Sequence, residues 1–226
     1  QIELRVLAHL SGDGNLIAAF SEGVDIHTKT ASEVFGISPE QITLEQRSAA
    51  KAINFGIVYG ISSFGLARGT GLSRSQAQDY IDSYFERYPG VKRYMRDAVT
   101  QGRSQGYVTT ILGRRRYLPE LRSRRYQERS FGERTAMNTP IQGSAADIIK
   151  LAMLKVYRRL KNERLRTTML LQVHDELVFE TPQEELHEAA AIIREEMEGA
   201  YLLKVPLAVD IGAGPNWLDI EVMGYA

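Results

Sequence analysis

Residues 47–60 read Arg47-Ser-Ala-Ala-Lys51-Ala-Ile-Asn-Phe55-Gly-Ile-Val-Tyr59-Gly60. Arg47, Lys51, Phe55 and Tyr59 recur every four residues, and residues four apart lie on one face of an α-helix. The residues between them are mostly small or apolar and can bury the other sides of that helix. Two cations followed by two aromatic rings suit a ligand with phosphates at one end and a flat ring at the other. A solvated cationic stripe is the alternative that spacing alone leaves open.

The pattern Arg-x-x-x-Lys-x-x-Asn-Phe-Gly-x-x-Tyr-Gly resembles motif B of the family A DNA polymerases, the bacterial DNA polymerase I group. The resemblance spans almost the whole chain, and two further motifs occur in the expected order. It implies a fingers helix that binds the incoming dNTP, with Arg47 and Lys51 on the β- and γ-phosphates. Phe55 would stack beneath the sugar and base, and Tyr59 would lie beside the templating position. Lys51 would also protonate the leaving pyrophosphate as a general acid.

His174-Asp175-Glu176 lies between two β-prone runs, 167–173 and 177–180, and predicts the tip of a buried hairpin. Acids there need a cation or water, and a solvated turn is the alternative. The tripeptide resembles the family's motif C. That resemblance implies that Asp175 is the catalytic, metal-binding carboxylate, that Glu176 supports it, and that His174 lies near the primer terminus.

The resemblance also implies two Mg²⁺ ions, with Mn²⁺ as an alternative, because two-metal phosphoryl transfer uses divalent ions about 3.5–4 Å apart. One turn supplies only one side of such a site. Gln1-Ile-Glu3-Leu-Arg5 matches the second half of motif A, Asp-Tyr-Ser-Gln-Ile-Glu-Leu-Arg. The metal-binding Asp of that motif would precede Gln1. We therefore expect a C-terminal catalytic fragment, inactive without an upstream segment that carries this Asp, the thumb and the rest of the palm.

The remaining nucleotide contacts follow from the same resemblance. Glu3 would lie under the sugar and exclude a ribose 2′-hydroxyl, and Gln1 is assigned to the nucleotide site as well. His27, within Asp25-Ile-His27-Thr28, would contact the triphosphate at a helix start, where backbone N–H groups favour anions. A plain surface Glu and an incidental helical His are the alternatives.

Residues 134–147 resemble a family segment that touches the minor groove of the primer–template. Arg134, Asn138 and Gln142 are four apart and share a face if the helix continues past Pro140. Donors there can check the shape of a base pair, since every pair presents minor-groove acceptors. A helix N-cap with an incidental Gln is the alternative. Contacts to the DNA backbone are expected from Arg114, Arg115 and Arg116.

Composition places the chain among globular proteins, with 43% hydrophobic and 25% charged residues. It has no cysteine, which excludes disulfides and thiolate metal sites. No apolar run approaches the ~20 residues of a membrane span. The zero net charge hides eight arginines between positions 114 and 134 and an acidic region at 175–198. With the resemblance, we expect a bacterial cytoplasmic protein, associated with the nucleoid, that acts in DNA replication and repair.

Helical patterns through residue 106, followed by β runs mixed with helices, predict an α+β fold. The pattern predicts a strand end running into a helix at 1–10, two helices (124–137 and 140–160) broken at Thr139-Pro140, and a final strand at 205–211. The resemblance implies a right-hand polymerase architecture, with a helical fingers lobe inserted in an antiparallel-sheet palm and the thumb absent from this chain. The palm would comprise residues 1–14 and 131–226, and the fingers residues 15–130.

Two other functions compete with a DNA-templated DNA polymerase. A catalytically inactive nucleic-acid-binding relative would keep the fold, but the intact Arg47, Lys51 and Asp175 argue against it. A single-subunit RNA polymerase shares the architecture, but Glu3 and the spacing of Phe55 and Tyr59 favour deoxynucleotides. A comparison of primer extension with dNTP and NTP would separate the two polymerases.

Overall fold

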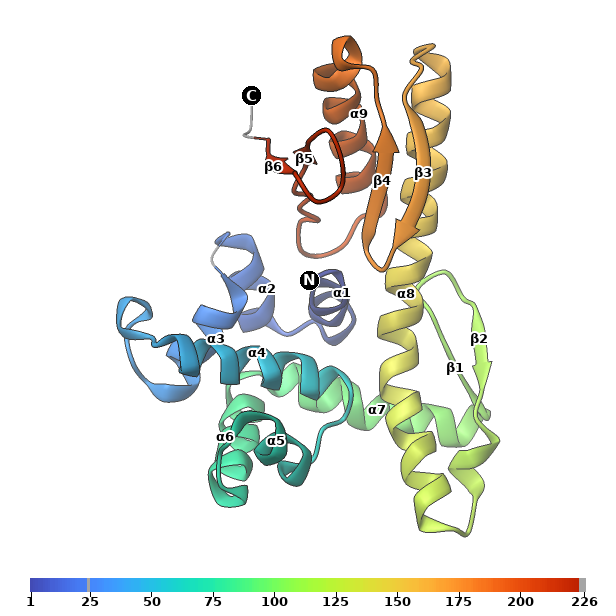
Figure 1. The fold of residues 1–226 in the computed structure, drawn as a ribbon. Helices are drawn as coiled ribbons and strands as arrows, with labels where there is room; N and C mark the ends of the chain where they lie inside the picture. The colour runs from blue at the N-terminus through green and yellow to red at the C-terminus, as the bar shows by residue number, and fades with distance from the viewer. Residues whose placement is uncertain (24, 224–226) are drawn as a thin grey trace. The chain divides into compact units, whose positions relative to one another are not determined.

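The computed structural model describes residues 1–23 and 25–223. Its contacts divide the chain into two compact units. The first unit comprises Gln1–Ala145 and Leu203–Val205, and the second comprises Ala146–Leu202 and Pro206–Ala226. The division falls within α8 (Tyr126–Asn162), a helix that contributes residues to both units (Figure 1). Whether residues 15–130 are the fingers and the rest the palm stays a prediction.

The first unit is mainly helical. Its elements are α1 (Ile2–Ser11), α2 (Gly14–Ser21), α3 (Ile26–Phe35), η1 (Pro39–Gln41), α4 (Leu44–Val58), α5 (Ser63–Thr70), α6 (Arg74–Arg87), α7 (Pro89–Gln105), β1 (Tyr107–Thr109), β2 (Arg115–Tyr117), η2 (Pro119–Arg122) and the first part of α8. The strands β1 and β2 form an antiparallel hairpin, with Val108 opposite Arg116.

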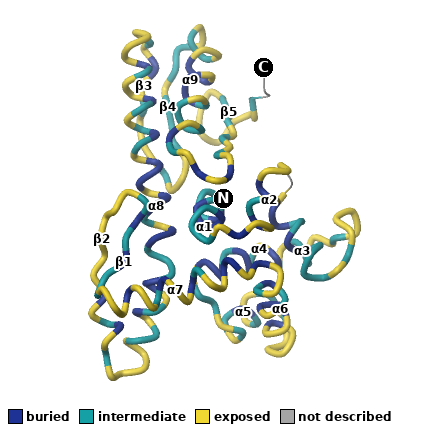
Figure 2. The backbone as a smooth tube through the Cα atoms, turned by 180° about the vertical axis from the view of Figure 1, so that it is seen from behind, coloured by how far each residue is buried: buried dark blue, intermediate teal, exposed yellow. Residues whose placement is uncertain are grey.

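Helix α4 contains most of the stretch in which Arg47, Lys51 and Phe55 recur every four residues. Thr43 and Gln46 form a reciprocal capping box at its start, which satisfies backbone N–H groups that lack intrahelical partners. Its apolar side is buried around Ile53 and Ile57 (Figure 2). Gly60 follows the helix with φ +65°, a left-handed conformation that disfavours any side chain.

The predicted strand end at residues 1–10 is wrong, because α1 begins at Ile2. The buried residues Leu4, Leu7 and Ala8 follow the three- and four-residue spacing of one helix face. The helix packs against α7 and α4. Burial of this face therefore decides the conformation of a segment whose sequence carries a mixed signal.

The predicted break at Thr139-Pro140 is also wrong, because α8 continues through Pro140. A proline inside a helix costs about 3 kcal/mol, since it removes one hydrogen bond and clashes with the preceding turn. Ala136 and Ile141, on either side of it, are both fully buried. Ser144 donates to the carbonyl of Pro140 and accepts from the N–H of Ile111 at 2.8 Å. Packing on both sides of Pro140 thus outweighs its cost.

The second unit packs a hairpin against helices. Beyond its part of α8, its elements are β3 (Thr168–Val173), β4 (Glu176–Glu180), η3 (Gln183–Glu185), α9 (Leu186–Glu198), β5 (Gly212–Ala213) and β6 (Glu221–Val222). Val156 and Leu160 of α8 form a core with Ile192 and Ile193 of α9, and Met169 and Phe179 of the hairpin pack against it. The hairpin thus has one face on this core.

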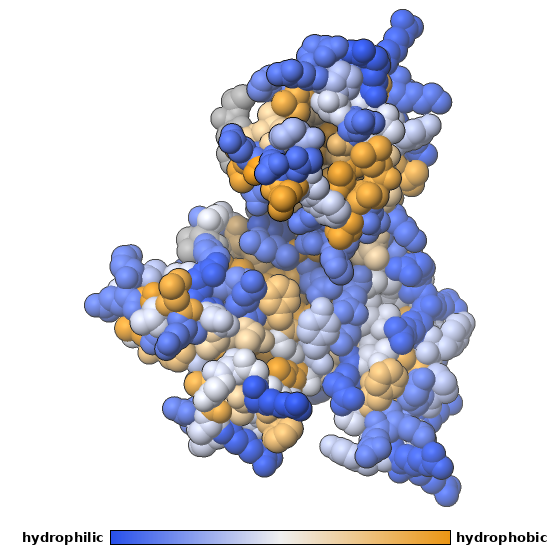
Figure 3. All heavy atoms as spheres, viewed as in Figure 1, coloured by the Kyte–Doolittle hydropathy of each residue, from blue (hydrophilic) through white to orange (hydrophobic). Residues whose placement is uncertain are grey.

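Two further expectations for the second unit fail. The hairpin expected to be buried is only partly buried, since Leu170 and Leu171 are 54% and 43% exposed. Figure 3 shows hydrophobic side chains on the surface of this unit. Residues 205–211 form no strand, although their exposure partly alternates. Alternating exposure indicates that one side of a segment faces the core, but a strand also needs backbone hydrogen bonds to a neighbouring strand. The N–H of Val209 instead donates to the Glu198 carboxylate at 3.0 Å.

Candidate functional site

The facing sides of α3 and α4 hold a cluster of polar groups. Asp25 is the N-cap of α3, and its carboxylate accepts from the backbone N–H of Thr28 at 2.8 Å. The guanidinium of Arg47 donates through Nε to Asp25 Oδ1 at 3.1 Å and through Nη2 to Oδ2 at 2.9 Å. Although burial raises the pKa of Asp25, the hydrogen bonds from Arg47 and Thr28 lower it to about 2. Asp25 is therefore an anion, and it already forms an ion pair with Arg47.

His27 lies in the first turn of α3 and is 5% exposed. Its Nδ1 lies 3.1 Å from Nδ2 of Asn54 on α4. Burial lowers the pKa of His27 below its ordinary value, Asp25 opposes this change, and Arg47 and Lys51 add to it. The imidazole is therefore neutral at pH 7.

Lys51 and Phe55 continue the same side of α4. Lys51 is exposed, and its charge acts on His27 closely enough to lower the pKa of that group. The ring of Phe55 is 5.8 Å from the His27 ring, centroid to centroid, with the planes tilted by 37°. The structure thus brings together four of the predicted nucleotide residues, namely His27, Arg47, Lys51 and Phe55.

A second group joins the end of α4 to α1 and α8. The Tyr59 hydroxyl donates to Glu3 Oε2 at 3.2 Å, and Gln142 is also its hydrogen-bond partner. Burial raises the pKa of Tyr59, Gln142 lowers it, and Glu3 raises it further. A Cβ on Gly60 would lie 3.1 Å from Cγ of Arg134, so the backbone of this turn approaches α8 closely. Gln1 accepts through its carbonyl from the N–H groups of Leu4 and Arg5 at the start of α1.

The predicted DNA contacts lie on α8 and on the β1–β2 hairpin. Because α8 is continuous, Arg134, Asn138 and Gln142 do share one face. Arg134 and Gln142 are exposed, and Asn138 is half-buried.

The three hairpin arginines differ in their surroundings. Arg114 donates to the carbonyl of Gly143 at 3.0 Å, which ties it to α8. Arg115 lies over the Tyr107 ring at 4.7 Å from its centroid, and Arg116 is exposed.

In the second unit, His174, Asp175 and Glu176 lie at the turn between β3 and β4, and all three are exposed. His174 has φ 54°, and its carbonyl accepts from Gln172 Nε2 at 2.9 Å. The backbone is therefore left-handed at His174. The next two residues, Asp175 and Glu176, both carry exposed carboxylates at this end of the hairpin. Adjacent exposed carboxylates supply hard oxygen donors of the kind that Mg²⁺ takes.

Within the described ranges, no three or more His, Cys, Asp or Glu side chains gather in a way that could hold a metal ion. Asp175 and Glu176 are two adjacent exposed carboxylates at the end of the β3–β4 hairpin. Mg²⁺ commonly binds through one or two carboxylates, with waters and substrate phosphates as its other ligands, so these donors fit such an ion.

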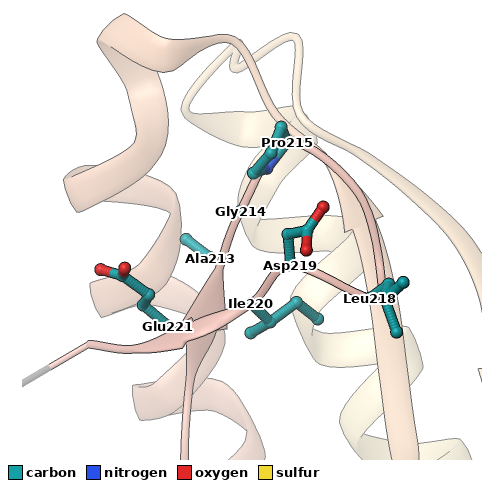
Figure 4. A pocket seen from close by; sticks show the side chains of 7 residues that line it. All are labelled: Ala213, Gly214, Pro215, Leu218, Asp219, Ile220 and Glu221. Atoms are coloured by element: carbon teal, nitrogen blue, oxygen red, sulfur yellow. The ribbon is translucent and has the colours of Figure 1, made fainter.

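A hollow beside β5 and β6 is lined by the residues labelled in Figure 4, which lie between Ala213 and Glu221. None of the predicted site residues is among them. In the part of the chain that the structure describes, the helices are too short or too polar to cross a membrane.

The fold matches that of a polymerase domain. A solved structure, the POL domain of Pol1 from M. smegmatis in complex with DNA primer-template and dNTP, superposes with a TM-score of 0.88. The two chains are 49% identical, and the match covers 92% of this chain and 36% of that one. The expected α+β class and polymerase architecture are thereby confirmed.

The sequence places the chain in one family. The profile of DNA polymerase family A matches residues 1–219, so the chain belongs to that family. DNA polymerase I of Geobacillus stearothermophilus and of Bacillus subtilis (strain 168) are each 56% identical to it over 221 residues. The match covers 98% of this chain and 25% of each relative, so the chain spans about a quarter of their length.

Sequence reasoning missed two residues of the α3–α4 cluster. Asp25 was quoted as the start of a helix, yet its carboxylate also binds Arg47. Asn54 belongs to the quoted motif, yet nothing in its spacing distinguishes it from a core position. Its signal is chemical, because a buried amide inside a helix needs hydrogen-bond partners beyond the helix backbone.

Proposed function

We propose that this chain is the dNTP-binding and catalytic part of a DNA-templated DNA polymerase. The proposal is supported by family membership and by the grouping of His27, Arg47, Lys51 and Phe55 on one side of α3 and α4. Two fixed cations, an imidazole and an aromatic ring match the phosphates and the base of a nucleotide. Gln1 and Glu3, at the start of α1, would complete the nucleotide site.

The roles proposed within the nucleotide site are those that the family resemblance implies. Arg47 binds a phosphate by exchanging the Asp25 carboxylate for phosphate oxygens, which a planar guanidinium can contact in pairs. Lys51 gives a proton to the leaving pyrophosphate, as a general acid. Phe55 stacks on the nucleotide. Glu3, hydrogen-bonded to Tyr59, fills the space that a ribose 2′-hydroxyl would need.

Asp175, supported by Glu176, would hold divalent metal, with Mg²⁺ the ion that hard carboxylate donors favour and Mn²⁺ an alternative. When bound, a pair of such ions lowers the pKa of the attacking hydroxyl and stabilises the leaving oxygen. A second carboxylate, from a segment that precedes Gln1 in the family motif, would share the metal. We therefore expect the 226-residue chain to be inactive alone.

Primer–template DNA is the proposed second partner. Arg134, Asn138 and Gln142 would meet the minor groove, where acceptors occur in every base pair. His174 would lie near the primer terminus. Backbone phosphates would be met by Arg114, Arg115 and Arg116. Of these, Arg116 is the best candidate, since Arg114 is tied to Gly143 and Arg115 packs on Tyr107.

Primer extension tests the proposal. The chain joined to the proposed upstream segment should extend a DNA primer with dNTP and Mg²⁺, and Asp175→Asn should abolish extension while DNA binding persists. The chain alone should bind a dNTP and fail to extend. Extension by the chain alone would refute the fragment hypothesis, and a joined protein that binds DNA but never extends would favour an inactive relative. Preference for NTP over dNTP would favour the RNA polymerase alternative.

A further inference from the structure

The turn of the β1–β2 hairpin lies beside α8 and is joined to it by hydrogen bonds (Figure 1). The N–H of Ile111, in that turn, donates to Ser144 Oγ at 2.8 Å. The guanidinium of Arg114 donates to the carbonyl of Gly143 at 3.0 Å. The two bonds link residues that are 33 and 29 positions apart in the chain. Both α8 residues directly follow Gln142, one of the predicted DNA contacts.

The Ser144 hydroxyl makes two bonds whose directions are fixed by its partners. A carbonyl oxygen only accepts, so the hydroxyl proton goes to the carbonyl of Pro140. A backbone N–H only donates, so Ser144 Oγ accepts from Ile111. Ser144 is fully buried, which keeps water from replacing either partner. Removal of this hydroxyl would therefore take away the acceptor of the Ile111 N–H.

Gly143 allows the turn to approach the helix closely. A Cβ on Gly143 would lie 2.5 Å from Thr110 Cγ2, well inside the ~3.5–4.0 Å at which two carbon atoms attract. Thr110 is itself 7% exposed, and its Oγ1 accepts from the N–H of Arg114 at 3.1 Å. A glycine inside a helix is less favourable than an alanine, so the missing side chain has its use in this contact.

We propose that Gly143 and Ser144 are positioning residues that dock the β1–β2 hairpin on α8. The docking holds the exposed Arg115 and Arg116 at a fixed place relative to the exposed Gln142. The DNA part of this inference rests on the proposed function, in which the arginines meet backbone phosphates and Gln142 meets the minor groove. A duplex keeps its backbone and groove at a fixed separation, so a docked hairpin binds it without a further ordering cost.

Amide hydrogen exchange of the 226-residue chain tests the docking without DNA. Ser144→Ala should speed the exchange of the Ile111 N–H by about fivefold or more, the factor for one lost hydrogen bond. Thr135→Val is the matched control, because Thr135 donates to the carbonyl of Phe131 within α8 in the same way, and it should leave Ile111 unchanged. Exchange at Ile111 that Ser144→Ala does not alter would overturn the proposal.

A pair of substitutions tests the close contact. Gly143→Ala should also speed exchange at Ile111, because the new Cβ pushes against the methyl of Thr110. Thr110→Ser removes that methyl and keeps the hydroxyl, and the new Cβ would then lie 3.8 Å from Cβ of residue 110. The double variant should therefore exchange Ile111 as slowly as Thr110→Ser alone. An effect of Gly143→Ala that Thr110→Ser does not reverse would contradict the assigned contact.

Binding of a primer–template duplex by the 226-residue chain separates this inference from the proposed function. Arg116→Ala should weaken binding and lower the salt slope by about one, as expected for one phosphate contact. Ser144→Ala should also weaken binding, and the two effects should not add, because a released hairpin no longer presents Arg116. Fully additive effects would overturn the positioning role. An unaltered chain that binds no duplex would contradict the proposed function, while the exchange at Ile111 would still decide the docking.

Discussion

The guanidinium of Arg47 and the carboxylate of Asp25 are joined by two hydrogen bonds, of 3.1 and 2.9 Å. Asp25 also caps α3 by accepting from the N–H of Thr28. One carboxylate therefore holds the start of α3 against a cation of α4. A phosphate that binds Arg47 must compete with this carboxylate.

The first prediction concerns that competition. Asp25→Asn keeps a side chain suited to an N-cap but removes the charge. Because Arg47 is released and a like charge no longer faces the phosphates, dNTP binding should tighten, by about fivefold for ~1 kcal/mol. Fluorescence titration of the chain with a dNTP measures this effect. Asp79→Asn, at an exposed position on α6, is the control and should leave affinity unchanged. Weaker binding by Asp25→Asn would show that Asp25 chiefly positions Arg47.

The second prediction concerns pH and stability. The pKa of Asp25 is lowered to about 2, below the ~3.9 of an unfolded chain. Its ion pair therefore stabilises the fold fully above about pH 4, and this contribution is lost as pH falls towards 2. Since both side chains are partly exposed, the contribution is about 0.5–1 kcal/mol. Urea unfolding should show Asp25→Asn less stable than the original chain at pH 5, with a smaller difference at pH 2.5. An equal difference at both pH values would contradict the pair's role.

The third prediction concerns sugar selection. Glu3 accepts from Tyr59 at 3.2 Å, which holds its side chain in place. In a polymerase assembled from this chain and its proposed upstream segment, Glu3→Ala should raise ribonucleotide incorporation about tenfold or more, because space opens for a 2′-hydroxyl. Competition between dNTP and NTP in primer extension measures the change. Glu3→Gln, which keeps the bulk, should change it far less. Unaltered discrimination in Glu3→Ala would exclude the role.

The fourth prediction concerns the turn after α4. Gly60 has φ +65°, and an added Cβ would lie 2.9 Å from Met137 Cε. Gly60→Ala should therefore lower the free energy of unfolding by about 1–2 kcal/mol. Gly69, in α5, has no atom within 4 Å of an added Cβ, so Gly69→Ala should raise it by up to ~1 kcal/mol. Equal effects of the two variants in thermal unfolding would contradict this account of Gly60.

The fifth prediction concerns proton transfer. In the assembled polymerase, Lys51→Ala should lower the single-turnover rate by about 10²–10⁴-fold if Lys51 is the general acid. Lys92→Ala, at an exposed position on α7, removes the same charge and should change the rate little. A Lys51→Ala enzyme that loses only dNTP affinity would limit Lys51 to phosphate binding.

The sequence alone determined much of the local structure. The capping pair Thr43 and Gln46 and the glycine at position 60 set the ends of α4, and four-residue spacing placed Arg47, Lys51 and Phe55 on one side of it. The hairpin that carries His174-Asp175-Glu176 followed from two β-prone runs around a polar turn. Such features are local, because capping, spacing and turn chemistry involve residues close together in the chain.

Only the tertiary structure decided the rest. Pro140 lies inside α8 because buried neighbours on both sides outweigh its cost. Residues 205–211 form no strand, and the N–H of Val209 donates to the Glu198 carboxylate instead of to a neighbouring strand. Asp25 meets Arg47, and Asn54 meets His27, across the contact of α3 with α4. Hydrogen bonds between residues more than twenty positions apart depend on how two helices pack. The spacing of residues within either helix does not determine that packing.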